Sequence, residues 1–269
     1  MSATSLNNPT ETTFNMPKLG IIQSRGLGDI VIALPIALHY HKEGWEVLWP
    51  VCEEFYPSVK DHAPWIKWIP IPTDSKGAFF YTEPELRLKN FKCDEILCLY
   101  QALNIRPELS QQPFFQIQHF DEFKYSKAGV PFLDKWRLDQ CITRNPQKEQ
   151  ELYDQVVANP NYVVYHTQGS TYSCSADLSS IPPEWQQIEI TPRPGYSVFD
   201  WLKIIEGAQA VILLDSVFSN LVDQLKIDVD KYWIPRSHIH LTPVMGTQWT
   251  ILEPPIDSLA AKPIFSPGN

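Results

Sequence analysis

Short runs of hydrophobic residues alternate along the first half of this chain with longer segments in which apolar residues recur at helical spacing. Such runs are typical of buried strands, and the recurring pattern is typical of helices. The predicted strands of this half are residues 19–24, 45–51, 65–71 and 94–100. A helix over 30–43 and a shorter one over 53–62 separate the first three strands, and Pro35 is expected to kink or delay the first helix. This alternation predicts a parallel sheet with helices on both faces.

A second alternation follows a stretch without a clear pattern. Residues 101–146 are polar and aromatic, and we expect a domain boundary there. Beyond it, the sequence predicts strands over 162–166, 188–190, 210–214 and 232–234, and helices over 198–207 and 216–225. We therefore expect an α/β protein with two Rossmann-like domains that face a central cleft. The predicted parts are a disordered tail over 1–17, an N-terminal domain over 18–145 and a C-terminal domain over 146–269.

Composition narrows the class of protein. The 269 residues are 43% hydrophobic, which is enough for one large core or two smaller ones. The net charge of −9 repels phosphate backbones, so broad nucleic-acid binding is not expected. No apolar run approaches the roughly 20 residues of a membrane span, and the polar N-terminal segment is unlike a signal peptide. Five cysteines without a CxxC pair fit a reducing, cytoplasmic setting.

The first candidate site is the loop Arg25-Gly26-Leu27-Gly28-Asp29, which lies between a strand and a helix. Glycines allow close backbone approach, and a helix N-terminus supplies unpaired N–H groups for an anion. One interpretation is dinucleotide binding, with Glu53 and Glu54 near the end of the second strand, although Val31 replaces the third glycine of that motif. In another, Asp29 is a general base that accepts a proton from an attacking hydroxyl. A third makes Asp29 an N-cap residue only.

Two further loops follow strands of the second half. Their small and polar residues suit a diphosphate or a ribose. The alternatives are a capped strand-to-helix turn for the loop with Asp215 and a structural role for His166. The candidates are His166, Thr167, Gly169 and Ser170 after one strand, and Asp215, Ser216, Ser219 and Asn220 after another. We expect Asp215 to shape its turn rather than to contact an anion.

No metal site is expected. Asp228-Val229-Asp230 has the D-x-D pattern of metal-dependent sugar transferases, but it lies in a polar turn between a helix and a strand. His238 and His240 lack a third ligand at a diagnostic spacing.

These motifs resemble those of the heptosyltransferase-like (family 9-like) glycosyltransferases of the GT-B fold. The strand, the Gly28-Asp29 loop and the helix with Leu34-Pro35 resemble the start of their N-terminal half. Residues 199–221, which include Asp215-Ser216, are similar to their donor-side helix and strand. Residues 125–136 resemble a linker of proteins assigned as glycosyltransferases in surface-polysaccharide clusters and phages.

The resemblance implies an inverting, metal-independent transfer of a hexosyl or heptosyl group from a nucleoside-diphosphate sugar, without a cofactor. The N-terminal domain would bind a glycan or another hydroxyl acceptor, and the C-terminal domain would bind the donor. Asp29 would be the base, Asp215 and Ser216 would lie on the donor side, and Arg193 or Arg236 would stabilise the departing nucleoside diphosphate. Two alternatives stay open: an NAD-dependent oxidoreductase that uses the Gly26-Leu27-Gly28 loop, and a non-catalytic nucleotide-sugar-binding protein. A homo-oligomer is compatible with each of them.

Overall fold

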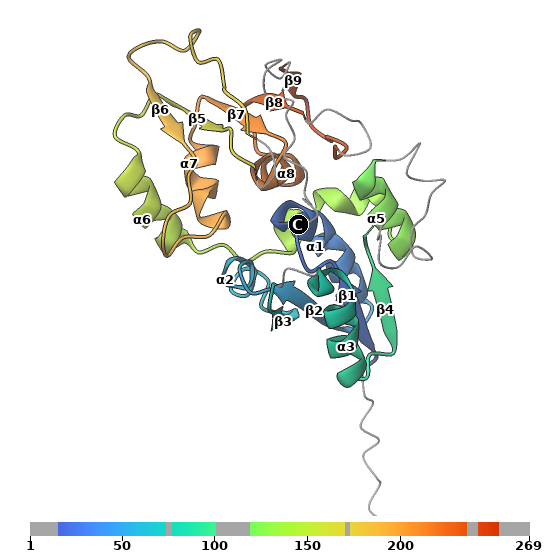
Figure 1. Cartoon of the computed structure of the whole chain (residues 1–269). Helices are drawn as coiled ribbons and strands as arrows, with labels where there is room; N and C mark the ends of the chain where they lie inside the picture. Colours follow the sequence, from blue (N-terminus) through green and yellow to red (C-terminus); the bar gives the residue numbers. More distant parts are fainter. Residues whose placement is uncertain (1–15, 74–76, 101–118, 170–172, 236–241, 253–269) are drawn as a thin grey trace, which may run out of the picture.

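The computed structural model describes residues 16–73, 77–100, 119–169, 173–235 and 242–252. Within them, the chain forms two separate parallel sheets that carry helices, so the predicted α/β class is confirmed. Figure 1 shows the two sheets at opposite ends of the molecule, with α1 and α8 between them. Residues 1–15 of the predicted tail lie outside this description.

The N-terminal half contains a sheet of order β3-β2-β1-β4. Its strands are β1 (Lys18–Ile22), β2 (Glu46–Cys52), β3 (Lys67–Ile71) and β4 (Glu95–Cys98). The helical elements of this half are α1 (Leu27–Lys42), α2 (Tyr56–Val59), the 3-10 turn η1 (Ala78–Phe80) and α3 (Thr82–Asn90). All pairs are parallel, and the register places Trp49 opposite Trp68. This strand order is that of one half of a Rossmann sheet.

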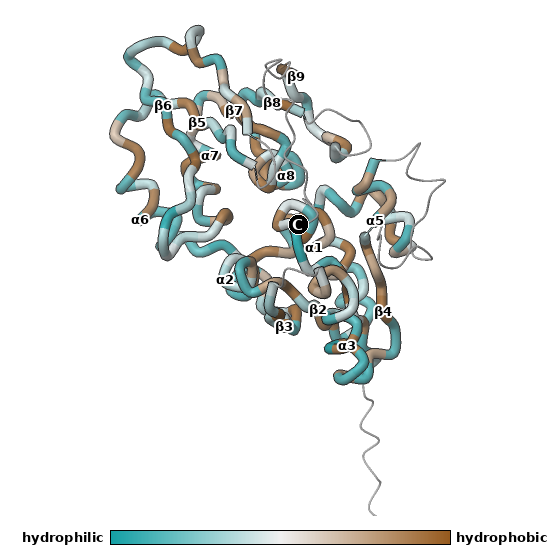
Figure 2. The backbone as a smooth tube through the Cα atoms, viewed as in Figure 1, coloured by the Kyte–Doolittle hydropathy of each residue, from teal (hydrophilic) through white to brown (hydrophobic). Residues whose placement is uncertain are grey.

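The C-terminal half contains a sheet of order β6-β5-β7-β8-β9. Its strands are β5 (Tyr162–His166), β6 (Gln186–Glu189), β7 (Ala210–Leu214), β8 (Asp230–Ile234) and β9 (Thr250–Ile251). Its helical elements are α6 (Pro146–Val156), the 3-10 turn η5 (Phe199–Trp201), α7 (Leu202–Glu206) and α8 (Val217–Gln224). All of these pairs are parallel as well. Figure 2 shows hydrophobic residues along β7, which is central in this sheet and fully buried, as expected for a strand inside a covered sheet.

The predicted helices differ from the observed ones in their limits. Helix α1 begins at Leu27, before the predicted start, and continues through Pro35. The helix predicted over 53–62 is reduced to the four residues of α2, and the one predicted over 198–207 begins as the 3-10 turn η5. Short helices obtain most of their stability from packing, which a local pattern does not contain.

The connection between the halves also contains helices that the sequence did not predict. Helix α5 (Phe120–Ala128) and the 3-10 turns η3 (Phe132–Trp136) and η4 (Leu138–Gln140) pack against α1. Helix α6, which begins at Pro146, packs on η5 and α7 of the second half. The domain limit between residues 145 and 146 stays a prediction.

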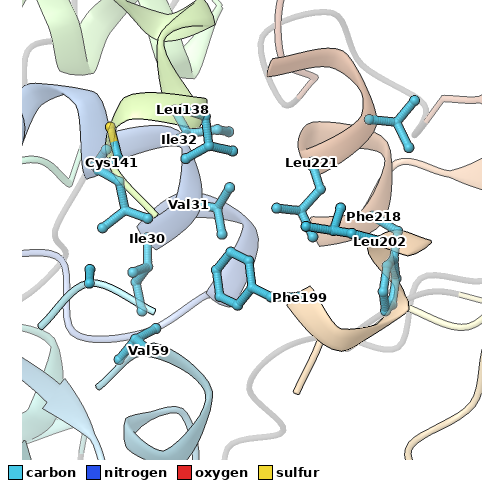
Figure 3. Packing of buried hydrophobic residues seen from close by; sticks show 14 of the residues in the cluster. Ile30, Val31, Ile32, Val59, Leu138, Cys141, Phe199, Leu202, Phe218 and Leu221 are labelled. Carbon is cyan, nitrogen blue, oxygen red and sulfur yellow. The ribbon is translucent and has the colours of Figure 1, made fainter. Parts of the chain in front are cut away.

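One hydrophobic core joins the two halves. Residues Ile30 to Ala37 of α1 are buried without interruption, as expected for a helix enclosed on all sides. The same core includes Val31 of α1, Phe199 of η5 and Leu221 of α8. Figure 3 shows the ring of Phe199 extending toward α1, and Leu221 facing α1 opposite Val31. The N-terminal part of α1 therefore packs against the second half.

Residues 242–249, which we call the strap, return from the second half to the connecting helices. The carbonyl of Thr242 lies 2.9 Å from Nδ1 of His119 at the start of α5, and the N–H of Val244 donates to Asp121 at 3.0 Å. The next residues of the strap bind Asp223 of α8, so the strap fastens α5 and α8 to each other.

Candidate functional site

The two sheets each have a position where the chain order of the strands reverses. In the N-terminal half this position lies between β1 and β4, and in the C-terminal half it lies between β5 and β7. Ligands of open α/β sheets bind beyond the carboxyl ends of the strands at such positions. The loop that holds Asp29 follows β1, and the loops that begin with Thr167 and Asp215 follow β5 and β7. The structure thus places all three predicted loops at the two reversal points.

Asp29 lies in the first turn of α1, where a carboxylate interacts favourably with the helix dipole. The N-cap residue is Gly26, and the interpretation of Asp29 as the N-cap is therefore wrong. Gly26 has a φ of 82°, and a Cβ atom at this position would lie 2.5 Å from Oδ2 of Asp29. Only a glycine can form this turn without displacing the carboxylate.

A buried lysine holds the other oxygen of Asp29. Nζ of Lys124 lies 3.1 Å from Oδ1 of Asp29, and the exposed fractions of these side chains are 4% and 37%. The same ammonium group donates to Oε1 of Gln23 at 2.6 Å and to the carbonyl of Leu99 at 3.1 Å. Asp29 is thus held by a buried ion pair on one side, and the rest of its side chain is exposed to solvent.

Arg25 lies beside this group at the carboxyl edge of the first sheet. Its guanidinium group lies 5.1 Å from the ring centre of Phe79 and 3.9 Å from Oε1 of Glu54. Both charged side chains are about two-fifths exposed, at 42% and 41%. The N–H of Arg25 donates to the hydroxyl of Tyr100 at 3.0 Å, and burial raises the pKa of that hydroxyl. The loop that holds Asp29 therefore also presents a partly exposed cation.

On the second half, the polar residues after β7 form the start of α8. Ser216 is the N-cap, and its N–H donates to Oγ of Ser219 at 3.0 Å in a capping box. Asn220 donates from Nδ2 to the carbonyl of Ser216 at 2.8 Å, while its buried Oδ1 has no hydrogen-bond partner among the described residues. Ser219 is fully buried, so it shapes the turn instead of facing a ligand directly.

His166 supports this turn. Its Nδ1 lies 3.1 Å from Oγ of Ser216, and burial lowers the pKa of its imidazole to about 4. The ring is therefore uncharged at neutral pH, and it contacts Phe218 edge to face. Thr167 and Asp215 are buried beside it, in line with roles in the shape of the loops.

Two other predicted residues, Gly169 and Arg193, follow strands of the second sheet at the same edge. Gly169 follows His166 in the loop after β5, and Ser170 and Arg236 lie outside the described residues. Arg193 follows β6, with its guanidinium 6.0 Å from the ring centre of Trp201. Its buried Nε has no hydrogen-bond partner within the part of the chain that the structure describes.

The loop of Asp29 in the first half and the start of α8 in the second half meet at Gly28. A Cβ atom on Gly28 would lie 3.5 Å from the amide nitrogen of Val217 and 3.5 Å from Nδ2 of Asn220. The first turn of α1 therefore touches the first turn of α8. Because helix N-termini carry partial positive charge, this junction favours a negatively charged ligand beside Asp29.

The D-x-D residues are remote from this junction. Asp228 and Asp230 are exposed at the amino end of β8, whereas the candidate residues lie at the carboxyl ends of the strands. Among the residues that the structure describes, no group of three or more His, Cys, Asp or Glu side chains is arranged to hold a metal ion. In the same part of the chain, no helix is both long and apolar enough to cross a membrane.

No family model matches the chain, and no curated protein matches its sequence. Among solved structures, it is similar to the glycosyl transferase family 9 protein of Veillonella parvula DSM 2008. The two share 13% identity and a TM-score of 0.55, over 88% of this chain and 86% of the other. The chain has a GT-B-like fold. It is also similar to the heptosyltransferase WaaC of E. coli in a structure with ADP, at 14% identity and a TM-score of 0.50 over 91% of this chain and 95% of the other. The GT-B-like fold predicted from the sequence is thereby confirmed, and the chemistry is argued from this chain's own residues.

Lys124 and Gln23 are the site residues that sequence reasoning missed. Gln23 was assigned to a strand, and Lys124 lies in the segment without a clear pattern. One signal was available, since Lys124 lies between Phe120 and Ala128 at helical spacing, in line with apolar neighbours. A lysine at such a position is buried with its stem among apolar residues and requires an acceptor for its ammonium group.

Proposed function

We propose that this protein is a glycosyltransferase that moves a sugar from a nucleoside-diphosphate sugar to an acceptor hydroxyl, with inversion at the anomeric carbon and without a metal ion. The observation that carries the proposal is the position of Asp29. It is a partly exposed carboxylate, held by Lys124 in the first half, beside the junction with the α8 N-terminus of the second half. The GT-B-like fold and the family 9 resemblance of the motifs support the same function.

In the proposed reaction, Asp29 accepts the proton of the acceptor hydroxyl. The oxygen of that hydroxyl forms a bond to the anomeric carbon while the bond from that carbon to the diphosphate oxygen breaks. The electron pair leaves with the nucleoside diphosphate. Attack from the side opposite the leaving group inverts the configuration.

The second half would stabilise the charge on the leaving group. Phosphate oxygens bind well at helix N-termini, and α8 begins directly after the buried turn of Asp215 and Ser216. Arg193, which follows β6 in the chain, would add a positive charge near the leaving group. The N-terminal half would bind a glycan or another hydroxyl acceptor, and a role in polysaccharide biosynthesis in the cytoplasm follows from the same proposal.

The first experiment is a thermal-shift panel with UDP, GDP, ADP, TDP, CMP and NAD at equal concentrations. A ligand at about 100 times its dissociation constant stabilises a protein by roughly 2.7 kcal/mol. We expect a selective shift with one nucleoside diphosphate, because the ADP in the WaaC structure shows a fold of this kind with such a ligand. A shift with NAD alone would instead identify the oxidoreductase, and no shift with any ligand would contradict the transferase.

The second experiment replaces Asp29 with Asn. Loss of a general base reduces a rate by about 100-fold or more, whereas the amide preserves the size of the side chain. We expect the variant to bind the nucleoside diphosphate of the panel and to release it from the corresponding nucleotide sugar much more slowly. Full activity of Asp29→Asn would rule out the base assignment.

A further inference from the structure

Lys124 is a buried cation at the point where the strand order of the first sheet reverses. Its side chain is only 4% exposed, although it comes from α5, in the connection between the halves. Its ammonium group reaches the space between the ends of β1 and β4. There it donates hydrogen bonds to the carbonyl of Leu99 and to the side chain of Gln23. This is the strand end from which the loop with Asp29 departs.

The ammonium group has three protons and three acceptors there. Two acceptors, Oε1 of Gln23 at 2.6 Å and the carbonyl of Leu99 at 3.1 Å, are neutral. The third, Oδ1 of Asp29 at 3.1 Å, is a carboxylate oxygen. A buried charge is costly unless it is paired and fully hydrogen-bonded, so Asp29 completes the environment of Lys124.

This arrangement gives the two oxygens of Asp29 different roles. Oδ1 is bound to Lys124. Oδ2 lies 2.5 Å from the position that a Cβ atom of residue 26 would occupy, so it is directed toward Gly26. Gln23 strengthens the arrangement, because its Nε2 donates to the carbonyl of Arg25 at 2.8 Å and so ties the loop to the lysine. The ion pair with Lys124, which Gln23 also holds, restricts the rotation of the carboxylate.

We propose that Lys124 is a positioning residue for Asp29 and that it directs Oδ2 to receive the proton of the acceptor hydroxyl. The inference rests on the proposed function, since it assigns Lys124 to the same reaction. Lys124 does not touch the substrate and acts through Asp29 alone. A base that is held in one orientation acts faster than one that must be oriented in each turnover.

The test compares Lys124→Met with Lys127→Met. The second variant removes an exposed lysine from the same helix, so both variants change the net charge by the same amount. The assay is release of nucleoside diphosphate from the nucleotide sugar that the panel identifies, with water as the acceptor. We expect Lys124→Met to lower the turnover number at least 10-fold while the dissociation constant for the nucleoside diphosphate stays within twofold. Lys127→Met should match the wild type. A wild-type turnover number for Lys124→Met would overturn the proposal.

A thermodynamic cycle separates positioning from a structural effect. The denaturation midpoints of Lys124→Met, Asp29→Asn and the double variant should not be additive, because the two side chains are in contact. Additive shifts would mean that the pair does not form and would overturn the proposal. If Lys124→Met does not fold, Gln23→Leu takes its place in the assay: slower release with unchanged nucleotide binding supports the proposal, and unchanged release contradicts it. An active Asp29→Asn variant would refute the base assignment on which this inference rests, and the absence of any shift in the nucleotide panel would contradict the proposed function; a wild-type turnover number for Lys124→Met refutes only the positioning role of Lys124.

Discussion

A methyl group at position 26 would have to occupy the space of the Asp29 carboxylate. Gly26 combines a positive φ with a Cβ position 2.5 Å from Oδ2 of Asp29. Gly195 has a φ of 87°, and no atom of the described residues lies within 4 Å of its Cβ position. Both alanine substitutions introduce backbone strain of about 1–2 kcal/mol. Only Gly26→Ala also displaces the carboxylate.

We therefore expect both variants to lower the melting temperature by similar amounts and only Gly26→Ala to slow the release of nucleoside diphosphate, by about 10-fold or more. Differential scanning fluorimetry and the release assay measure the two effects. Equal activity of the two variants would show that the exact place of Oδ2 does not matter.

At the scale of elements, α8 is fixed by a single buried carboxylate. Asp223 is fully buried and accepts hydrogen bonds from the indole N–H of Trp136 at 2.8 Å and from that of Trp249 at 3.1 Å. The backbone N–H groups of Gly246 and Thr247 donate to it at 3.0 Å. Helix α8, the turn η3 and the strap are thus held together at one side chain.

Asp223→Ala would remove the acceptor of these four donors, of which Gly246 is exposed and the other three residues are half-buried. An unsatisfied buried group costs about 1–3 kcal/mol, and water can replace the acceptor at the exposed donor, so we expect the free energy of unfolding to fall by about 2 kcal/mol. Urea denaturation followed by tryptophan fluorescence measures the change, and the exposed Asp228→Ala serves as the control with a change within about 0.5 kcal/mol. A small effect of Asp223→Ala would mean that the strap contributes little to stability.

Some of the helices and strands could be predicted from the sequence, and others could not. Strands such as β5 and β7 are predicted at their observed limits, because continuous apolar runs that end in polar loops have few alternatives. Helix α5 was missed, because Lys124 and Asp121 interrupt its apolar face and their partners are far away in the sequence. For the same reason the Asp29 loop could be found from local motifs, whereas the lysine beneath it could not.

At the scale of the whole molecule, stability should depend on pH through His166. Burial lowers the pKa of this imidazole from 6.5 to about 4 in the folded protein. Between these values the unfolded chain binds more protons than the folded one, so acid favours unfolding. The difference corresponds to about 3 kcal/mol, which is present above pH 6.5 and is lost as the pH falls to 4.

The measurement is urea denaturation of the wild type and of His166→Asn between pH 7 and pH 4. We expect the wild type to lose up to about 3 kcal/mol more stability than the variant over this interval. His41→Asn, which changes an exposed histidine, should follow the wild type. Identical slopes for the wild type and His166→Asn would show that this imidazole becomes protonated without unfolding.

The strap affects the order in which contacts of this protein can form during its synthesis. Asp121 and Lys135, a fully buried ion pair at 2.6 Å, emerge long before Val244, whose N–H donates to Asp121. Asp223 likewise emerges before Gly246 and Thr247, which donate to it. During translation these charged side chains must remain hydrated until the last of their partners has been synthesised. The N-terminal sheet can therefore form early, but the contacts that fasten α5 to α8 are complete only after Thr247 has left the exit tunnel.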